Sequence, residues 1–304
     1  MAAPLPDALR PDIAGTGADA GAGAGGLGRP GARRRGRARA LEIWVPAGVL
    51  ILIAAACFLW PLVYPVPPPV GGSILNAGLP PFSPGHILGT DPVGNDILSR
   101  LLYGGRVSFE VGVATALIGL VVGGLLGIVA GYQGGVVDAI VMRVLDVLIA
   151  FPSLVLALVI AEALGPSELH TIWAISFFSV PAFGRIARAA TLRLREQTFM
   201  LAARLSGTGG RRMLLRHVVP NILPQLTTFA LLGVGIAIIL EGALSYLGLG
   251  IPPPGPSWGN MIALGAQTLT AAPELVLIPS ICLFVTVLCL NLLGDALRAR
   301  WGVQ

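Results

Sequence analysis

The side chains with the most evident potential for chemistry are eight arginines between residues 185 and 216. Only one acid, Glu196, accompanies them, and long apolar runs lie on both sides of the segment. Arginine pairs readily with carboxylates, so this segment could contact the acids of a protein partner. The arginines are Arg185, Arg188, Arg193, Arg195, Arg204, Arg211, Arg212 and Arg216.

Several kinds of catalysis are excluded by residue types that are missing. All 20 basic residues are arginine, so the chain has neither the lysine of a phosphate-binding P-loop nor a Schiff-base lysine. His86, His170 and His217 are far apart, and the chain has no HExxH motif, no G-x-S-x-G motif and no pair of carboxylates at working spacing. We therefore expect no enzymatic activity, no metal and no cofactor in this chain.

Two further features limit the choice of ligand. The cysteines fall inside apolar runs without a CxxC pair, which is typical of small buried hydrophobic residues. The arginines lack interleaved aromatic residues for base stacking, so we expect no nucleic-acid partner. The cysteines are Cys57, Cys282 and Cys289.

Asp146 and Glu241 are acids inside apolar runs, where ionisable groups are costly and therefore candidates for function. They could belong to a proton relay, or each could be paired at a helix contact or face an aqueous cavity. Pro152 and Pro181 each interrupt a helical pattern. Each is either a static kink or a flexing point that lines a pathway.

Composition places all of these residues in a membrane protein. Of the 304 residues, 55% are hydrophobic and 12% are charged, whereas a soluble domain has about 25% charged residues. Runs long enough to cross a bilayer predict an all-α membrane protein with six transmembrane helices. They cover residues 43–63, 107–130, 140–163, 171–190, 222–246 and 274–293.

The distribution of arginine predicts the orientation of these spans. With both termini in the cytoplasm, 18 of the 20 arginines lie on the cytoplasmic side, where basic residues concentrate. Only Arg100 and Arg106 then lie outside. The predicted organisation is a disordered, Arg-rich cytoplasmic tail (1–40) that could contact anionic lipid, and a membrane domain (43–298) with external loops 64–106 and 247–273 and a cytoplasmic insert 193–220.

The cytoplasmic insert 193–220 has the pattern of two short helices joined by a glycine bend. Strong helix formers run from residue 193 to 205, and Gly207 is a natural left-handed terminator. A second helix is predicted over 211–219, before Pro220. The insert could be a pair of amphipathic helices lying at the membrane surface, or a docking element for a cytosolic protein.

Glycines at GxxxG spacing occupy the second apolar run. Gly119, Gly123 and Gly127 recur every four residues, and small residues allow membrane helices to approach closely. We expect this stripe to mark a close helix contact, either within the chain or with another subunit.

The sequence "LAARLSGTGGRRMLLRHVVP" resembles the EAA loop of ABC importer permeases, the cytoplasmic segment that contacts the ATPase. Ala202, Ala203 and Gly207 match that pattern in type and spacing, and Val219-Pro220 closes it. The chain departs from the pattern at two positions, where Leu201 replaces a glutamate and His217 replaces a hydrophobic residue. The ATPase-coupling residues implied by the resemblance are Leu201, Ala202, Ala203, Arg204, Leu205, Gly207, His217 and Pro220.

Two more stretches are similar to the dipeptide/oligopeptide/nickel type of these permeases, and to its second, "C", subunit. "HILGTDPVGNDILSRLLYGGRVSF" carries the external-loop motif Asp91, Asp96, Arg100 and Arg106, with Asn95 where arginine is usual. "EGALSYLGLGIPPPGPSWGNMI" is close to the last external loop of the same family. The resemblance covers residues 43–298.

The resemblance implies a type I ABC importer permease in the cytoplasmic (inner) membrane. Such a chain moves a small solute, which we expect to be di- or oligopeptides, into the cell by alternating access. Its implied partners are separate ATPase subunits that bind the ATP, a homologous second permease and an extracytoplasmic solute-binding protein. The other classes considered are a proton-coupled secondary transporter and a membrane scaffold without transport activity.

Overall fold

A computed structural model describes residues 30–63 and 67–301, and most of these residues are helical. Within these ranges there is no strand, only two isolated bridges that join Ser83 to His86 and Thr90 to Asp96. The all-α prediction is confirmed. The helices are α1 (Pro30–Val63), α2 (Ile97–Ile118), α3 (Gly124–Gln133), α4 (Gly135–Ile149), α5 (Ser153–Leu164), α6 (Glu168–Arg195), α7 (Thr198–Leu205), α8 (Gly210–Met213), α9 (Val219–Tyr246), α10 (Trp258–Ala266) and α11 (Glu274–Trp301).

Two π-helical segments join helices into longer rods. η2 (Gly119–Gly123) connects α2 to α3, and η3 (Leu214–Val218) connects α8 to α9. A short 3-10 turn, η1 (Ile74–Asn76), lies in the loop before α2. The helix α1 begins at Pro30, so residues 30–40 are helical and not part of a disordered tail, whereas the rest of the predicted tail lies outside the described residues.

Four of the described helical rods are long and apolar enough to cross a membrane: 41–60, 97–133, 210–246 and 274–301. The pair α4 and α5 would make a fifth as one broken span. The remaining predicted span, residues 171–190, lies in α6, which has 28 residues but carries arginines that lower its hydropathy. α6 is therefore not among the helices that qualify by length and composition.

The predicted span 140–163 is broken at Pro152, where the sequence predicted an interruption. Its two halves, α4 and α5, meet at an angle of 83°. Pro152 causes the break, because proline has no N–H for the helical ladder and disfavours a helical conformation at the preceding Phe151. Pro152 has an extended ψ of 125° and stands immediately before the first turn of α5.

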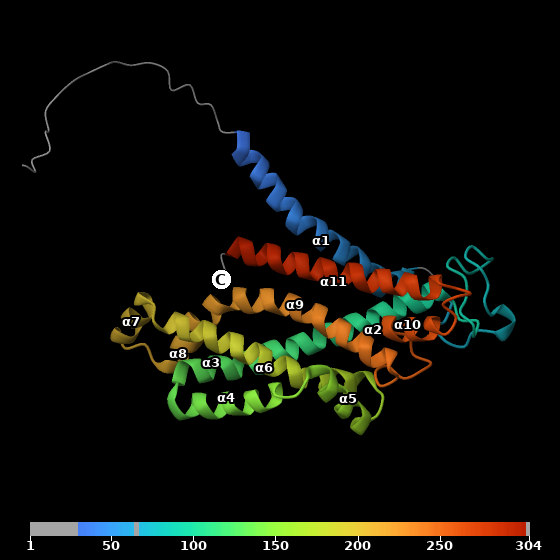
Figure 1. Ribbon diagram of the computed structural model, residues 1–304. Coiled ribbons are helices and arrows are strands. Elements are labelled where there is room, and N and C mark those ends of the chain that lie inside the picture. Colours follow the sequence, from blue (N-terminus) through green and yellow to red (C-terminus); the bar gives the residue numbers. More distant parts are fainter. Residues whose placement is uncertain (1–29, 64–66, 302–304) are drawn as a thin grey trace, which may run out of the picture.

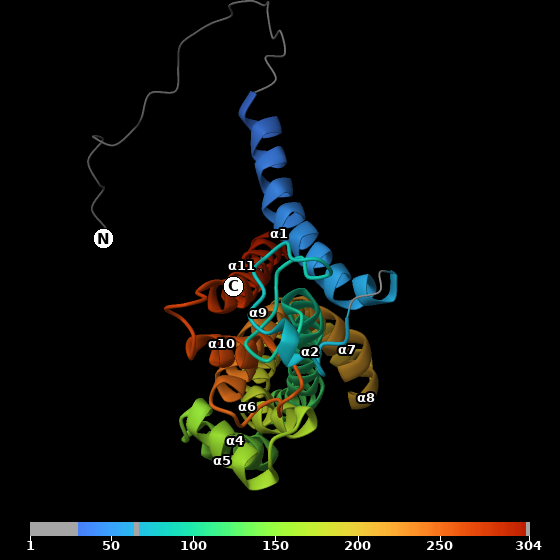
Figure 2. The same cartoon turned by 90° about the vertical axis from the view of Figure 1, so that its right-hand side faces the viewer.

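The bundle has distinct edges and ends (Figure 1). α1 and α11 form one edge and α4 and α5 the opposite edge, as the rotated view in Figure 2 also shows. The helices α2, α6 and α9 lie between them. α7 and α8 lie at one end of the bundle, and α10 and the loop before α2 lie at the other.

Glycines allow α6 to pack closely against η2 and α3. A Cβ atom added at Gly123 would lie 2.2 Å from the carbonyl oxygen of Val180, and one at Gly127 would lie 2.1 Å from that of Gly184. The expected close contact at the glycine stripe is confirmed as a contact within the chain. On its other side, Gly184 meets Leu145 of α4, so α6 is held between α3 and α4.

Candidate functional site

The short helix α7 is anchored to the bundle by two buried methionines. Met200 of α7 and Met213 of α8 are both fully buried, in a cluster with Ile128 of α3 and Ala187 of α6. Ala203 is partly buried and packs against the same cluster. This cluster joins α7 and α8 to α3 and α6.

The opposite face of α7 is exposed and apolar. Leu201 is 58% exposed and Leu205 is 81% exposed, with Ala202 and Arg204 exposed beside them. A helix of eight residues with one face buried and large leucines on the other has an uncovered contact surface. Ala203, one of the coupling residues that the resemblance implies, faces the bundle and does not share this exposed face with Leu205.

The predicted helix over residues 193–205 is also divided. α6 continues to Arg195, and α7 starts only at Thr198. The Nη1 atom of Arg195 donates to the carbonyl oxygens of Gly131 and Tyr132 at 3.2 and 3.1 Å. These carbonyls belong to the last turn of α3, so Arg195 caps that helix and fixes the point from which α7 departs.

Gly207 ends α7 with a φ of +75°, as predicted. The Thr208 N–H donates to the carbonyl of Ala203 at 3.1 Å, and the Gly207 N–H to that of Arg204 at 3.0 Å. This pair of bonds is a Schellman motif, which requires a left-handed residue at the position of Gly207.

The second predicted helix, 211–219, does not stop at Pro220. α8, η3 and α9 form one continuous helical rod, with Pro220 in the first turn of α9. Proline removes one donor from the ladder, and a π-helical turn accommodates such an irregularity. His217 is half-buried in η3, and its carbonyl accepts a hydrogen bond of 2.6 Å from Asn221 Nδ2.

Two arginines of α6 form ion pairs with acids of α4. Arg185 Nη2 lies 2.6 Å from Asp146 Oδ1, and Arg188 Nη2 lies 2.6 Å from Asp138 Oδ2. The partners of Asp146 and Asp138 could not be assigned from the sequence, because they are about 40 to 50 residues away along the chain.

The external-loop motif forms a hydrogen-bonded cap on α2. Asp96 accepts from the Ser99 N–H at 2.7 Å as the N-cap of α2, and its other oxygen lies 2.8 Å from His86 Nδ1. Asp91 Oδ1 accepts from the backbone N–H groups of Val93 and Asn95. The amide of Asn95 donates to Asp91 Oδ2, so Asn95 completes the cap.

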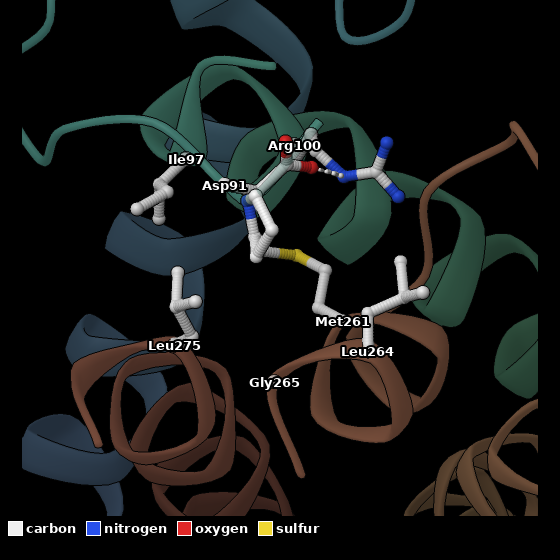
Figure 3. Close-up of a pocket in the computed structure, with 8 residues that line it drawn as sticks. Asp91, Ile97, Arg100, Met261, Leu264, Gly265 and Leu275 are labelled. Atoms are coloured by element: carbon white, nitrogen blue, oxygen red, sulfur yellow. Dashed lines mark ion pairs between the residues drawn. The ribbon is translucent and has the colours of Figure 1, made fainter. Parts of the chain in front are cut away.

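Arg100 ties this cap to the loop between α9 and α10. It is buried, with its Nε 3.7 Å from Asp91 Oδ2 and its Nη1 3.4 Å from the carbonyl of Pro254. Figure 3 shows Asp91 and Arg100 above Met261 and Leu264 of α10. The cavity between them has a volume of about 20 Å³, room for one water molecule and not for a solute. Arg106 lies apart from the cap and pairs with Glu110 at 2.9 Å.

Glu241 is fully buried where α2, α9 and α10 meet. Ser108 of α2 and Ser245 of α9 each donate to its carboxylate at 2.7 Å, and Ser257 before α10 is a third donor. The Ser245 oxygen also accepts from the Ile251 N–H at 3.1 Å. Glu241 is thus a helix-packing residue whose serine partners the sequence did not indicate. Pro181 is likewise buried, inside α6.

The described residues form a bent helical bundle with four to five apolar spans and an anchored helix at one end, which is the architecture of a membrane protein. The profile of the family "Binding-protein-dependent transport system inner membrane component" matches residues 123–303. The chain belongs to this family. This family membership confirms the resemblance to an ABC importer permease that the motifs predicted.

Named relatives point to the same class. The chain is 38% identical to the glutathione transport system permease protein GsiD of Pectobacterium atrosepticum, over 84% of this chain and 85% of that protein. It is 40% identical to the dipeptide transport system permease protein DppC of Alkalihalophilus pseudofirmus, over 70% of each. Neither relationship supports the secondary transporter as an alternative.

A solved structure shares the fold. A chain of the inward-facing MetNI methionine ABC transporter matches with a TM-score of 0.54 at 15% identity, covering 66% of this chain and 95% of that one. At this identity the likeness concerns the fold alone, and it confirms the type I importer bundle.

Proposed function

We propose that this chain carries di- and oligopeptides, glutathione-like tripeptides among them, into the cell as one half of an ABC importer. The named relatives transport a dipeptide and glutathione, both of which are peptides. The observation that supports a driven importer most directly is the uncovered leucine surface of α7, Leu201 and Leu205, which is held on a buried methionine anchor.

The proposed partners follow from this surface and from the family. ATPase subunits bind the exposed face of α7, with Arg204, Arg211 and Arg212 placed to pair with acids on them. A second, homologous permease completes the pathway, and an extracytoplasmic binding protein delivers the solute. ATP is bound by the ATPase subunits, because this chain has no P-loop lysine. Both termini lie in the cytoplasm.

In the proposed mechanism, α7 acts as a lever. Closure of the ATPase dimer displaces α7, and the cluster around Met200 and Met213 passes the movement to α3, α6 and α9. Packed interfaces shift between discrete arrangements, so a small displacement at α7 can switch the bundle between its inward-open and outward-open forms.

The test is a substitution of Leu205 by aspartate. In a packed groove the unpaired carboxylate would cost about 2–7 kcal/mol, so we expect Leu205→Asp to lose the ATPase subunits on purification and to lose peptide uptake. Leu75→Asp is the matched control, because Leu75 is also an exposed leucine but lies at the opposite end of the bundle. Retention of the ATPase subunits and wild-type uptake by Leu205→Asp would contradict the proposal.

A further inference from the structure

A groove with a volume of about 590 Å³ lies between α1, α2 and α6. Ligand sites typically have volumes of about 300–1,000 Å³. Ala54 of α1 and Ala114 of α2 line the groove, and their small side chains leave space between the helices. Larger apolar side chains supply much of the remaining wall, among them Phe58, Leu117 and Ile172. The groove is therefore large enough for a small solute and mainly apolar.

Two carboxylic acids interrupt this apolar lining. Glu110 of α2 and Glu168, the first residue of α6, both line the groove, and their side chains are within hydrogen-bonding reach of each other. Each shares a helix face with an apolar lining residue, because Val113 follows Glu110 by three residues and Ile172 follows Glu168 by four. The two acids and the apolar wall therefore border the same space.

Arg106 balances only part of the charge of this pair of acids. Its Nε atom lies 2.9 Å from Glu110 Oε1, and its guanidinium lies over the Phe58 ring, 5.6 Å from the centroid. Among the described residues, Arg106 is the one cation that acts electrostatically on Glu168, which precedes the predicted span 171–190. Burial and, next, the carboxylate of Glu110 raise the pKa of Glu168 in spite of Arg106. A further cation beside the two acids would relieve this repulsion.

We propose that this groove binds the N-terminal residue of a peptide, with its ammonium group between Glu110 and Glu168 and its side chain against the apolar wall. An ammonium group donates three hydrogen bonds, and bonds to carboxylates are charge-assisted. A metal ion fits less well, because Ca²⁺ takes about six to eight oxygen ligands and the described residues hold no group of three potential side-chain ligands. This inference rests on the proposed transport of peptides and adds the residues with which the chain itself holds them.

The first experiment measures whether a free peptide N-terminus protects the groove. Val113 lines the groove and is 43% exposed, so Val113→Cys places a thiol there. This variant, with the native cysteines replaced by alanine, is assembled with its partner subunits in an alkyl glycoside detergent, without amine-bearing lipid or the binding protein. Leucyl-glycyl-glycine should slow the reaction of the thiol with a maleimide. Its N-acetylated form, which has lost the charged donor, should need an at least about tenfold higher concentration for the same protection. Equal protection by the two forms would overturn the proposal.

The second experiment locates the ammonium group. Glu168→Gln removes one carboxylate and keeps the size of the side chain, so we expect it to remove most of the difference between the two peptides. Glu162→Gln is the matched control, because Glu162 is an exposed acid of α5 that does not line the groove, and it should keep the difference. Co-purification of the partner subunits shows that each variant is assembled. An unchanged difference in Glu168→Gln, or its loss in Glu162→Gln, would overturn the proposal.

Other occupants of the groove would give different results. A lipid amine is a second source of an ammonium group. If phosphatidylethanolamine alone slows the labelling of Val113→Cys and the free tripeptide adds no protection, the groove binds lipid. If assembly with the second permease alone blocks the labelling, that subunit fills the groove. Either result would overturn the proposal.

A separate measurement distinguishes this inference from the proposed function. Uptake of the free tripeptide is measured for the wild-type complex with ATP and its binding protein. If the complex imports no peptide, the proposed function fails, and this inference fails with it. If it imports the tripeptide but the free and acetylated forms protect Val113→Cys equally, only the inference fails.

Discussion

Gly207 offers the sharpest test of how α7 is connected to the bundle. Its φ is +75°, and an added Cβ would have no other heavy atom within 4 Å. The cost of Gly207→Ala is therefore conformational and not steric, about 1–2 kcal/mol for an L-residue in the left-handed region. A cost of this size lowers the ratio of capped to frayed α7 ends by about 5- to 30-fold.

Gly209 supplies a matched control for this substitution. It also has open space around its Cβ position, but its φ is −64° and its ψ is 150°, a conformation that alanine adopts freely. Two quantities are measured in the reconstituted complex: amide hydrogen exchange over residues 204–210, and peptide imported per ATP hydrolysed. We expect Gly207→Ala to exchange faster and to import less per ATP, and Gly209→Ala to behave like wild type. If the two variants are indistinguishable in both measurements, the rigid bend plays no part in coupling.

Three further predictions concern packing, burial and nucleotide. Gly127→Ala would press against Gly184, so we expect it to destabilise the complex by about 1–3 kcal/mol and to lower its melting temperature. Gly124→Ala is the control and should leave the melting temperature unchanged, because an added Cβ there would lie 3.7 Å from its nearest neighbour. Equal melting temperatures of the two variants would refute the close contact at Gly127. Glu241→Ala leaves buried serine hydroxyls without their acceptor, so we expect it to destabilise the complex by about 1–3 kcal/mol for each hydroxyl. A wild-type melting temperature would show that these hydrogen bonds do not stabilise the complex. The isolated chain should show no saturable ATP binding in equilibrium dialysis, because it has no lysine for a P-loop, and saturation would disprove this.

Local sequence patterns predicted those parts of the molecule that depend on neighbouring residues. The positive φ of Gly207, the break at Pro152 and the close packing of the glycine stripe follow from steric properties of single residues. The length and apolar character of the spans likewise follow from composition.

The rest depends on contacts between distant segments. Helical spacing puts Ala203 and Leu205 on opposite sides of α7, and the cluster around Met200 determines which side faces the bundle. The division at residue 196 needs Arg195 to reach the end of α3. The ion pairs of Arg185 and Arg188 with acids of α4 likewise join segments that are distant in the sequence.

ATP-driven peptide uptake into lipid vesicles tests the central claim most directly. The vesicles contain this chain, a second permease and the ATPase subunits, and receive a labelled dipeptide or tripeptide with a binding protein. The account predicts uptake that requires ATP, the binding protein and this chain together, and that Leu205→Asp abolishes. Uptake that proceeds without ATP when a proton gradient is imposed would contradict it.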